Sequence, residues 1–127
     1  MPAKKIRILL IEDDPDQVHM YKTQFKVDGF EVFHCMKCLD LLSLLKNKKI
    51  DIILLDIILG TESGEDILRE LKDKGITDKI PVIIFSNLKG KDDQKRYLKM
   101  GARDYWPKTK FLPHELSQQI KSFLKNN

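Results

Sequence analysis

Cysteine is scarce in this chain of 127 residues, and its two occurrences limit the sites that it can build. Cys35 and Cys38 form one Cys-x-x-Cys pair, and no pair of histidines follows them at ligand spacing. One such pair cannot supply the four ligands of a structural zinc site. The spacing also matches thioredoxin-like redox motifs, which stay open as an alternative. Because Cys35 ends an apolar stretch, we expect it to be a small buried hydrophobic residue.

Long apolar runs are absent as well. No stretch approaches the roughly 18 apolar residues of a membrane-spanning helix. Lys4, Lys5 and Arg7 precede an apolar run, as in a signal peptide, but the run ends at Ile11 in a group of acids and no small-residue cleavage site follows. We therefore expect a cytoplasmic protein without a membrane partner. Since no linker or low-complexity tract interrupts the sequence, we expect one domain over residues 1–127.

Aromatic residues are few, at 8% of the chain, and they are not interleaved with the basic residues. A binder of single-stranded nucleic acid combines the two kinds of residue, so direct nucleic-acid binding is not expected despite the net charge of +4. We interpret the short basic clusters as solvated faces, with docking of an acidic partner as the alternative. These clusters are Lys4–Lys5, Lys46/Lys48/Lys49, Lys89/Lys91 and Lys108/Lys110.

Short apolar stretches alternate five times with amphipathic stretches of helical periodicity. IILL at 52–55 and VIIF at 82–85 are continuously apolar, which is typical of parallel strands covered by helices on both faces. Five such units predict an α/β fold, a doubly wound, flavodoxin-like parallel sheet of five strands in the order 2-1-3-4-5. Asp14 and Pro15 predict the start of the first helix. Strands are expected at Ile6–Ile11, Phe30–Cys35, Asp51–Leu55, Pro81–Phe85 and Arg103–Trp106, and helices at about 15–28, 38–47, 64–74, 91–100 and 113–125.

Polar side chains stand at the ends of four of the expected strands. Glu12 and Asp13 follow the first strand, Asp56 the third, Ser86 the fourth and Lys108 the fifth. In this strand order the first and third strands flank the point where such sheets bind ligands. Carboxylates that converge there repel one another unless a cation lies between them, and Mg²⁺ prefers oxygen ligands. The sequence therefore predicts a Mg²⁺ site at this edge of the sheet.

In this order and at these spacings, the residues resemble the receiver domain of response regulators in two-component signalling. The resemblance extends over essentially all 127 residues. It rests on the acidic pair in LLIEDDP, on Asp56 in ILLDIILGTESG with Gly64 eight positions on, on Ser86 in VIIFSN, and on Lys108 within GARDYWPK. It implies a stand-alone phosphorylatable switch in a phosphorelay, not an enzyme, since a receiver catalyses only its own phosphorylation and dephosphorylation.

The resemblance implies an acceptor and a metal site. Asp56 is the nucleophile that takes a phosphoryl group from a histidine kinase, from a phosphotransfer protein or from a small phosphodonor. Asp13 and Asp56 bind Mg²⁺ directly. Glu12 contacts the metal largely through water, and the carbonyl of Ile58 adds a ligand.

It also implies how the added group is sensed. Lys108 pairs with one phosphoryl oxygen. Ser86 bonds another and draws the following loop inward, and Tyr105 changes rotamer with that movement. A downstream protein then binds the face formed by the fourth helix, the fifth strand and the fifth helix. Dimerisation on phosphorylation stays open.

Three positions depart from the family pattern. Gly60 stands where a proline usually follows the acceptor, and Asn87 stands where a small residue usually follows the hydroxyl. Thr109 replaces the proline after the lysine, where the family's Lys-Pro bond is generally cis. A cis bond before a non-proline residue costs about 2.5–4 kcal/mol. The connection to Leu116 is also one residue longer than usual, so we predict a trans 108–109 bond, with Lys108 still directed at Asp56 and Phe111 packed under the start of the fifth helix.

Three other functions stay open. A Mg²⁺-dependent phosphatase would carry a second aspartate two residues after the nucleophile, where this chain has Ile58. A degenerate receiver would bind a partner without phosphorylation. A flavodoxin-like flavin binder would need a glycine- and hydroxyl-rich loop after the first strand, where this chain has acids. The remaining candidates, expected to be surface or packing residues, are His19, His34, His114 and Trp106.

Overall fold

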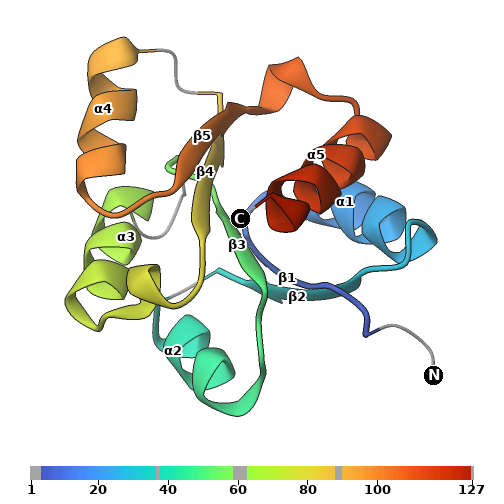
Figure 1. Cartoon of the computed structure of the whole chain (residues 1–127), viewed down its shortest axis with the longest axis horizontal. Helices are drawn as coiled ribbons and strands as arrows, with labels where there is room; N and C mark the ends of the chain where they lie inside the picture. Colours follow the sequence, from blue (N-terminus) through green and yellow to red (C-terminus); the bar gives the residue numbers. More distant parts are fainter. Residues whose placement is uncertain (1–3, 37, 59–62, 88–89, 127) are drawn as a thin grey trace.

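The predicted five-stranded parallel sheet is present in the computed structural model, which describes residues 4–36, 38–58, 63–87 and 90–126. Its strand order is β2-β1-β3-β4-β5, as the sequence predicts (Figure 1). Each strand lies within one residue of its predicted bounds. The strands are β1 (Arg7–Ile11), β2 (Glu31–Cys35), β3 (Ile52–Leu55), β4 (Val82–Ser86) and β5 (Asp104–Pro107).

Helices cover both faces of the sheet. In Figure 1, α1 and α5 lie on one side, and α2, α3 and α4 lie on the other. Two short 3-10 turns, which the periodicity does not reveal, follow α3 and β5. The helices are α1 (Pro15–Val27), α2 (Cys38–Asn47), α3 (Gly64–Asp73), α4 (Lys91–Lys99) and α5 (Pro113–Lys125), and the 3-10 turns are Ile76–Asp78 and Lys108–Lys110.

The apolar core consists of two layers, one on each side of the sheet. Alternate residues of each central strand point to opposite faces, so Leu9 packs toward α2, α3 and α4, and Leu10 packs toward α1 and α5. All residues of β3 and β4 are buried. This explains why their sequences are continuously apolar rather than alternating.

Two core predictions need correction. Leu42 and Leu45 of α2 were expected to point inward beside Leu41, but only Leu41 is fully buried. Both of the other leucines are half-buried, and they line a groove at the edge of the core. The apolar stripe of α2 is therefore wider than the surface that the sheet covers.

The predicted trans bond between Lys108 and Thr109 is confirmed, since the described residues contain no cis peptide bond. The extra residue of this connection is taken up by the 3-10 turn Lys108–Lys110. Phe111 is half-buried directly before α5, with its ring centre 6.2 Å from that of Trp106. Pro107 ends the edge strand β5 opposite Ser86, a place where a proline removes no inner ladder bond. None of the helices formed by the described residues could span a lipid bilayer.

Candidate functional site

Asp56 lies where β3 ends, and its carboxylate is held on both oxygens. Oδ1 accepts hydrogen bonds from the Ser86 hydroxyl at 2.8 Å and from the backbone N–H of Ile58 at 3.0 Å. Oδ2 accepts a bond from the Lys108 ammonium at 2.9 Å. The residue is only 7% exposed. Each neighbour comes from a different part of the fold, so the carboxylate has one fixed orientation.

Lys108 bridges the first and third strands at the carboxyl edge of the sheet. The turn after β5 brings its ammonium into the site, where the residue is 9% exposed. The ammonium donates hydrogen bonds to Glu12 of the loop after β1, to Asp56, and to the side-chain oxygen of Gln17 at 2.7 Å. Its three protons are therefore matched by three oxygen acceptors, two of them anionic.

The charges of Glu12 and Lys108 depend on each other. Burial raises the pKa of Glu12, and the bond from Lys108 opposes that rise. Burial alone would lower the pKa of Lys108, but its bonds to Glu12 and Asp56 outweigh burial and raise it. The lysine is therefore a fixed cation at neutral pH, as a partner for anionic oxygens must be.

Gln17 and His34 belong to this region, although the sequence analysis did not place them there. Gln17 stands three residues after Asp14, whose carboxylate caps α1 by accepting the N–H of Asp16 at 2.9 Å. An acid followed three residues later by glutamine is a signal for the first turn of a helix, and that signal could have placed Gln17 beside the strand ends. The Nε2 of His34 on β2 lies 2.6 Å from the Glu12 carbonyl oxygen, so this nitrogen carries the proton.

Gly64 lets the first turn of α3 touch the backbone of Asp56 and Ile57. A Cβ built on Gly64 would lie 2.2 Å from the carbonyl oxygen of Asp56 and 2.5 Å from the Cα of Ile57. Both contacts are shorter than any side chain tolerates. The N–H of Gly64 also donates to the Ile57 carbonyl at 3.1 Å. A residue without a side chain is therefore required here.

The oxygen donors predicted for Mg²⁺ line one pocket of about 230 Å³, together with Ser86 and Lys108, which bond to the Asp56 carboxylate. Their chemistry, carboxylates and a carbonyl-bearing loop, suits a hard divalent cation. In the described part of the chain, however, no three acidic, histidine or cysteine side chains are placed to hold a metal together. The Lys108 ammonium lies between Glu12 and Asp56 instead. The predicted Mg²⁺ ligands that line this pocket are Glu12, Asp13, Asp56 and Ile58.

The family of the chain follows from sequence comparison. The family model of the response regulator receiver domain matches residues 8–121. The chain belongs to this family. The receiver domain of the Francisella response regulator 1452 has a TM-score of 0.83 at 26% identity, over 96% of this chain and 98% of that one. The predicted fold and family are both confirmed.

Two curated relatives are longer than this receiver domain. CpxR of Klebsiella pneumoniae, a transcriptional regulatory protein, is 31% identical over 121 residues, which are 95% of this chain and 50% of CpxR. The response regulator SaeR of Staphylococcus aureus is 33% identical over 117 residues, which are 92% of this chain and 50% of SaeR. The chain spans about half the length of the curated relatives it matches.

Two further predictions concern buried residues of the receiver domain. Tyr105 is 8% exposed and packs in the same cluster as Tyr97 of α4, and burial raises its pKa to about 12. Its side chain therefore lies in the core layer between β5 and α4. Cys35 is 5% exposed, as predicted, and burial raises its pKa to about 11. A thiol with so high a pKa is a poor redox nucleophile, which argues against the thioredoxin-like alternative.

Of the three departures from the family pattern, Asn87 and Thr109 can be placed. Asn87 lines the pocket that contains Asp56, beside Ser86. Thr109 lies in the 3-10 turn, which still directs Lys108 at Asp56. Gly60 lies outside the described residues.

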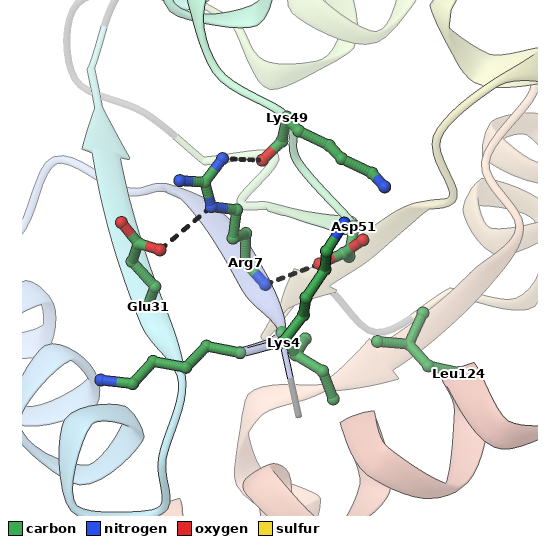
Figure 2. Close-up of a pocket in the computed structure, with 8 residues that line it drawn as sticks. Lys4, Arg7, Glu31, Lys49, Asp51 and Leu124 are labelled. Carbon is green, nitrogen blue, oxygen red and sulfur yellow. Dashed lines mark hydrogen bonds and ion pairs between the residues drawn. The ribbon is translucent and has the colours of Figure 1, made fainter. Parts of the chain in front are cut away.

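A larger hollow lies at the opposite edge of the sheet, where the strands begin (Figure 2). Arg7 occupies its centre with its partners already in place. Its Nε donates to Glu31 at 3.0 Å, its backbone N–H to Asp51 at 2.8 Å, and its Nη1 to the carbonyl oxygen of Lys49 at 3.4 Å. These bonds tie the starts of β1, β2 and β3 together. We interpret Arg7 as a structural residue.

Proposed function

We propose that this receiver domain is a signalling switch that accepts a phosphoryl group on Asp56. The observation that carries the proposal is the setting of that carboxylate. It is buried at the end of a central strand, borders an open pocket, and is contacted by a cation and a hydroxyl at 2.9 and 2.8 Å. These two side chains can follow the charge when a phosphoryl group is added to the carboxylate.

In the proposed step, a carboxylate oxygen of Asp56 attacks the phosphorus of a phosphohistidine on a histidine kinase or phosphotransfer protein. A P–O bond to Asp56 forms as the donor's P–N bond breaks, and the departing imidazole keeps the electron pair and takes up a proton. With a small acyl phosphate, a P–O bond of the donor breaks instead. The transition state spreads negative charge over the phosphoryl oxygens, where Lys108 can pair with it.

A bound Mg²⁺ would supply further positive charge to the phosphoryl oxygens, and Asp13, Asp56, Glu12 and the carbonyl of Ile58 are the groups we assign to it. Lys108 and Ser86 are already hydrogen-bonded to the acceptor. Each can therefore shift its bond from Asp56 to the added group without crossing the pocket. For Ser86 this shift also pulls on the end of β4, which leads toward α4.

The switch passes its signal on by binding another protein at one of its surfaces. We place a downstream protein on the face formed by α4, β5 and α5, because the buried Tyr105 of β5 packs in one cluster with Tyr97 of α4 and lies three residues before Lys108. The histidine kinase that supplies the phosphoryl group has its catalytic part in the cytoplasm, so we place this domain there as well. The alternative to a separate downstream protein is a second copy of this domain, which would pair through the same face only after phosphorylation.

Intact-mass measurement tests the proposal. Wild-type protein incubated with acetyl phosphate and Mg²⁺ should gain one phosphoryl group, and it should gain little without Mg²⁺. Asp56→Asn should gain none under either condition. An Asp56→Asn protein that is phosphorylated as readily as wild type would overturn the assignment. A wild-type protein that gains nothing from acetyl phosphate or from a phosphorylated kinase would favour the degenerate receiver.

A further inference from the structure

An apolar groove lies between α2 and the segment that follows α3. Its volume is about 320 Å³. None of its described lining residues belongs to the acceptor site or to the α4-β5-α5 face. The lining consists of four aliphatic and three basic residues, which are Leu42, Leu45, Ile76, Ile80, Lys46, Lys74 and Lys79.

The floor of the groove is a continuation of the core. Leu45, Ile76 and Ile80 pack against the buried layer under α2 and α3, yet each is only half-buried. Leu42, three residues before Leu45 in α2, adds a fourth half-buried aliphatic side chain. The volume suits one or two further aliphatic side chains. Filling it would remove apolar surface from water on both sides, which is favourable.

The rim of the groove is positive. Lys74 pairs with Glu70 at 3.4 Å, whereas Lys46 and Lys79 take part in no ion pair among the described residues. None of the described lining residues is acidic. Lys46 lies in the last turn of α2, where it complements the helix dipole. The helix dipole accounts for a lysine at position 46, but it does not account for the half-buried aliphatic residues beside that lysine.

We propose that this groove binds an acidic, amphipathic segment of a partner protein, with aliphatic side chains in the groove and carboxylates against the lysines. Nucleic acid fits less well, because it offers no aliphatic side chains and the described lining contains no aromatic residue on which a base could stack. The three lysines of the rim give the groove a positive field. Such a field increases the rate at which an acidic segment arrives.

The experiment uses a synthetic helical peptide with leucines at helical spacing on one face and glutamates on both flanks, titrated into ¹⁵N-labelled protein. The largest amide shifts should fall on residues 42–46 and 76–80. The double variant Lys46→Glu/Lys79→Glu should weaken binding by about tenfold or more, since two attractive charges become repulsive. Its own amide spectrum shows whether it is folded. Leu42→Gln, which changes the floor but not the charge, should also weaken binding.

Two matched controls distinguish binding in the groove from non-specific electrostatic attraction between the acidic peptide and the basic protein. Lys26→Glu/Lys125→Glu makes the same charge change on exposed positions of α1 and α5, on the other side of the sheet, and should bind as wild type does. A peptide with serines in place of the leucines should bind at least tenfold more weakly. Equal weakening by the control variant, equal binding of the serine peptide, or shifts spread over all basic surfaces would overturn the proposal. So would the absence of any shift.

Discussion

Replacing Gly64 by alanine probes how closely α3 approaches the acceptor. The added Cβ would lie 2.2 Å from the Asp56 carbonyl oxygen, 2.5 Å from the Cα of Ile57 and 3.0 Å from the carbonyl carbon of Asp56, whereas ordinary contacts begin at 3.4 Å. All three atoms belong to the backbone, so no side chain can rotate away. The start of α3 and the end of β3 must therefore separate by roughly 1 Å, as in other overpacked sites.

Two effects set the size of the stability loss. Overpacking of this kind costs about 1–3 kcal/mol. Alanine also restricts the unfolded chain more than glycine does, which returns about 0.4–1 kcal/mol. We expect a net loss of roughly 1–2 kcal/mol in the free energy of unfolding. The rate of phosphorylation should fall more than this loss of stability alone would cause, since a misplacement of about 1 Å at a reacting group costs on the order of 100-fold in rate.

Gly75→Ala is the matched control for this variant. Gly75 has a φ of +74°, but a Cβ there would meet no atom within 4 Å. Its cost is backbone strain of about 1–2 kcal/mol, less the same return of about 0.4–1 kcal/mol from the unfolded chain, so its net loss should not exceed that of Gly64→Ala. It lies at the far end of α3, away from Asp56. Urea unfolding and the rate of phosphorylation by acetyl phosphate, measured on both variants, separate stability from site geometry. If Gly64→Ala is phosphorylated as fast as Gly75→Ala, the close contact does not position the acceptor.

Three further predictions concern single side chains. Lys108→Met removes the cation from a buried pair and should cost about 3–5 kcal/mol in the free energy of unfolding at neutral pH. Without the lysine the pKa of Glu12 rises further, so the folded state holds a proton that the unfolded state releases, and the loss measured by urea unfolding should shrink as the pH falls toward 5. An equal loss at neutral pH and at pH 5 would contradict the pairing. Ser86→Ala should still be phosphorylated, but the NMR shifts that phosphorylation causes at the start of α4 should shrink, and full wild-type shifts would disprove the coupling. In a Cys38→Ser background, Cys35 should react with a thiol reagent at pH 8 only after unfolding in urea, and rapid reaction of the native protein would contradict its burial.

The fold could be predicted from the sequence because its two periodicities are clear. The apolar runs of β3 and β4 are bounded by polar residues, and α2 and α5 begin and end at the predicted residues. The strand ends also placed Asp56, Ser86 and Lys108 together, since parallel strands end at one edge of a sheet. The structure places the Ser86 hydroxyl and the Lys108 ammonium each within hydrogen-bond distance of the Asp56 carboxylate, one on each oxygen.

The details that the sequence left out depend on loops and side-chain packing. The 3-10 turn at Lys108–Lys110 has no periodic signal in three residues. The bonds from Lys108 to Glu12 and Gln17 depend on the path of that turn and on the rotation of α1 about its axis. The groove beside Leu42 reflects how far α2 lies from the segment after α3. The spacing of Asp14 and Gln17 places Gln17 in the first turn of α1, but the turn, the two bonds and the groove cannot be read from residue spacing.

Identification of the modified residue is the most direct test of the central claim. Protein phosphorylated with acetyl phosphate and Mg²⁺ is treated with borohydride, which reduces an aspartyl phosphate to homoserine, and is then digested and mapped by mass spectrometry. The account predicts homoserine in place of Asp56 and unmodified aspartate at Asp13 and Asp14. Homoserine at either of those positions, with Asp56 unchanged, would contradict it.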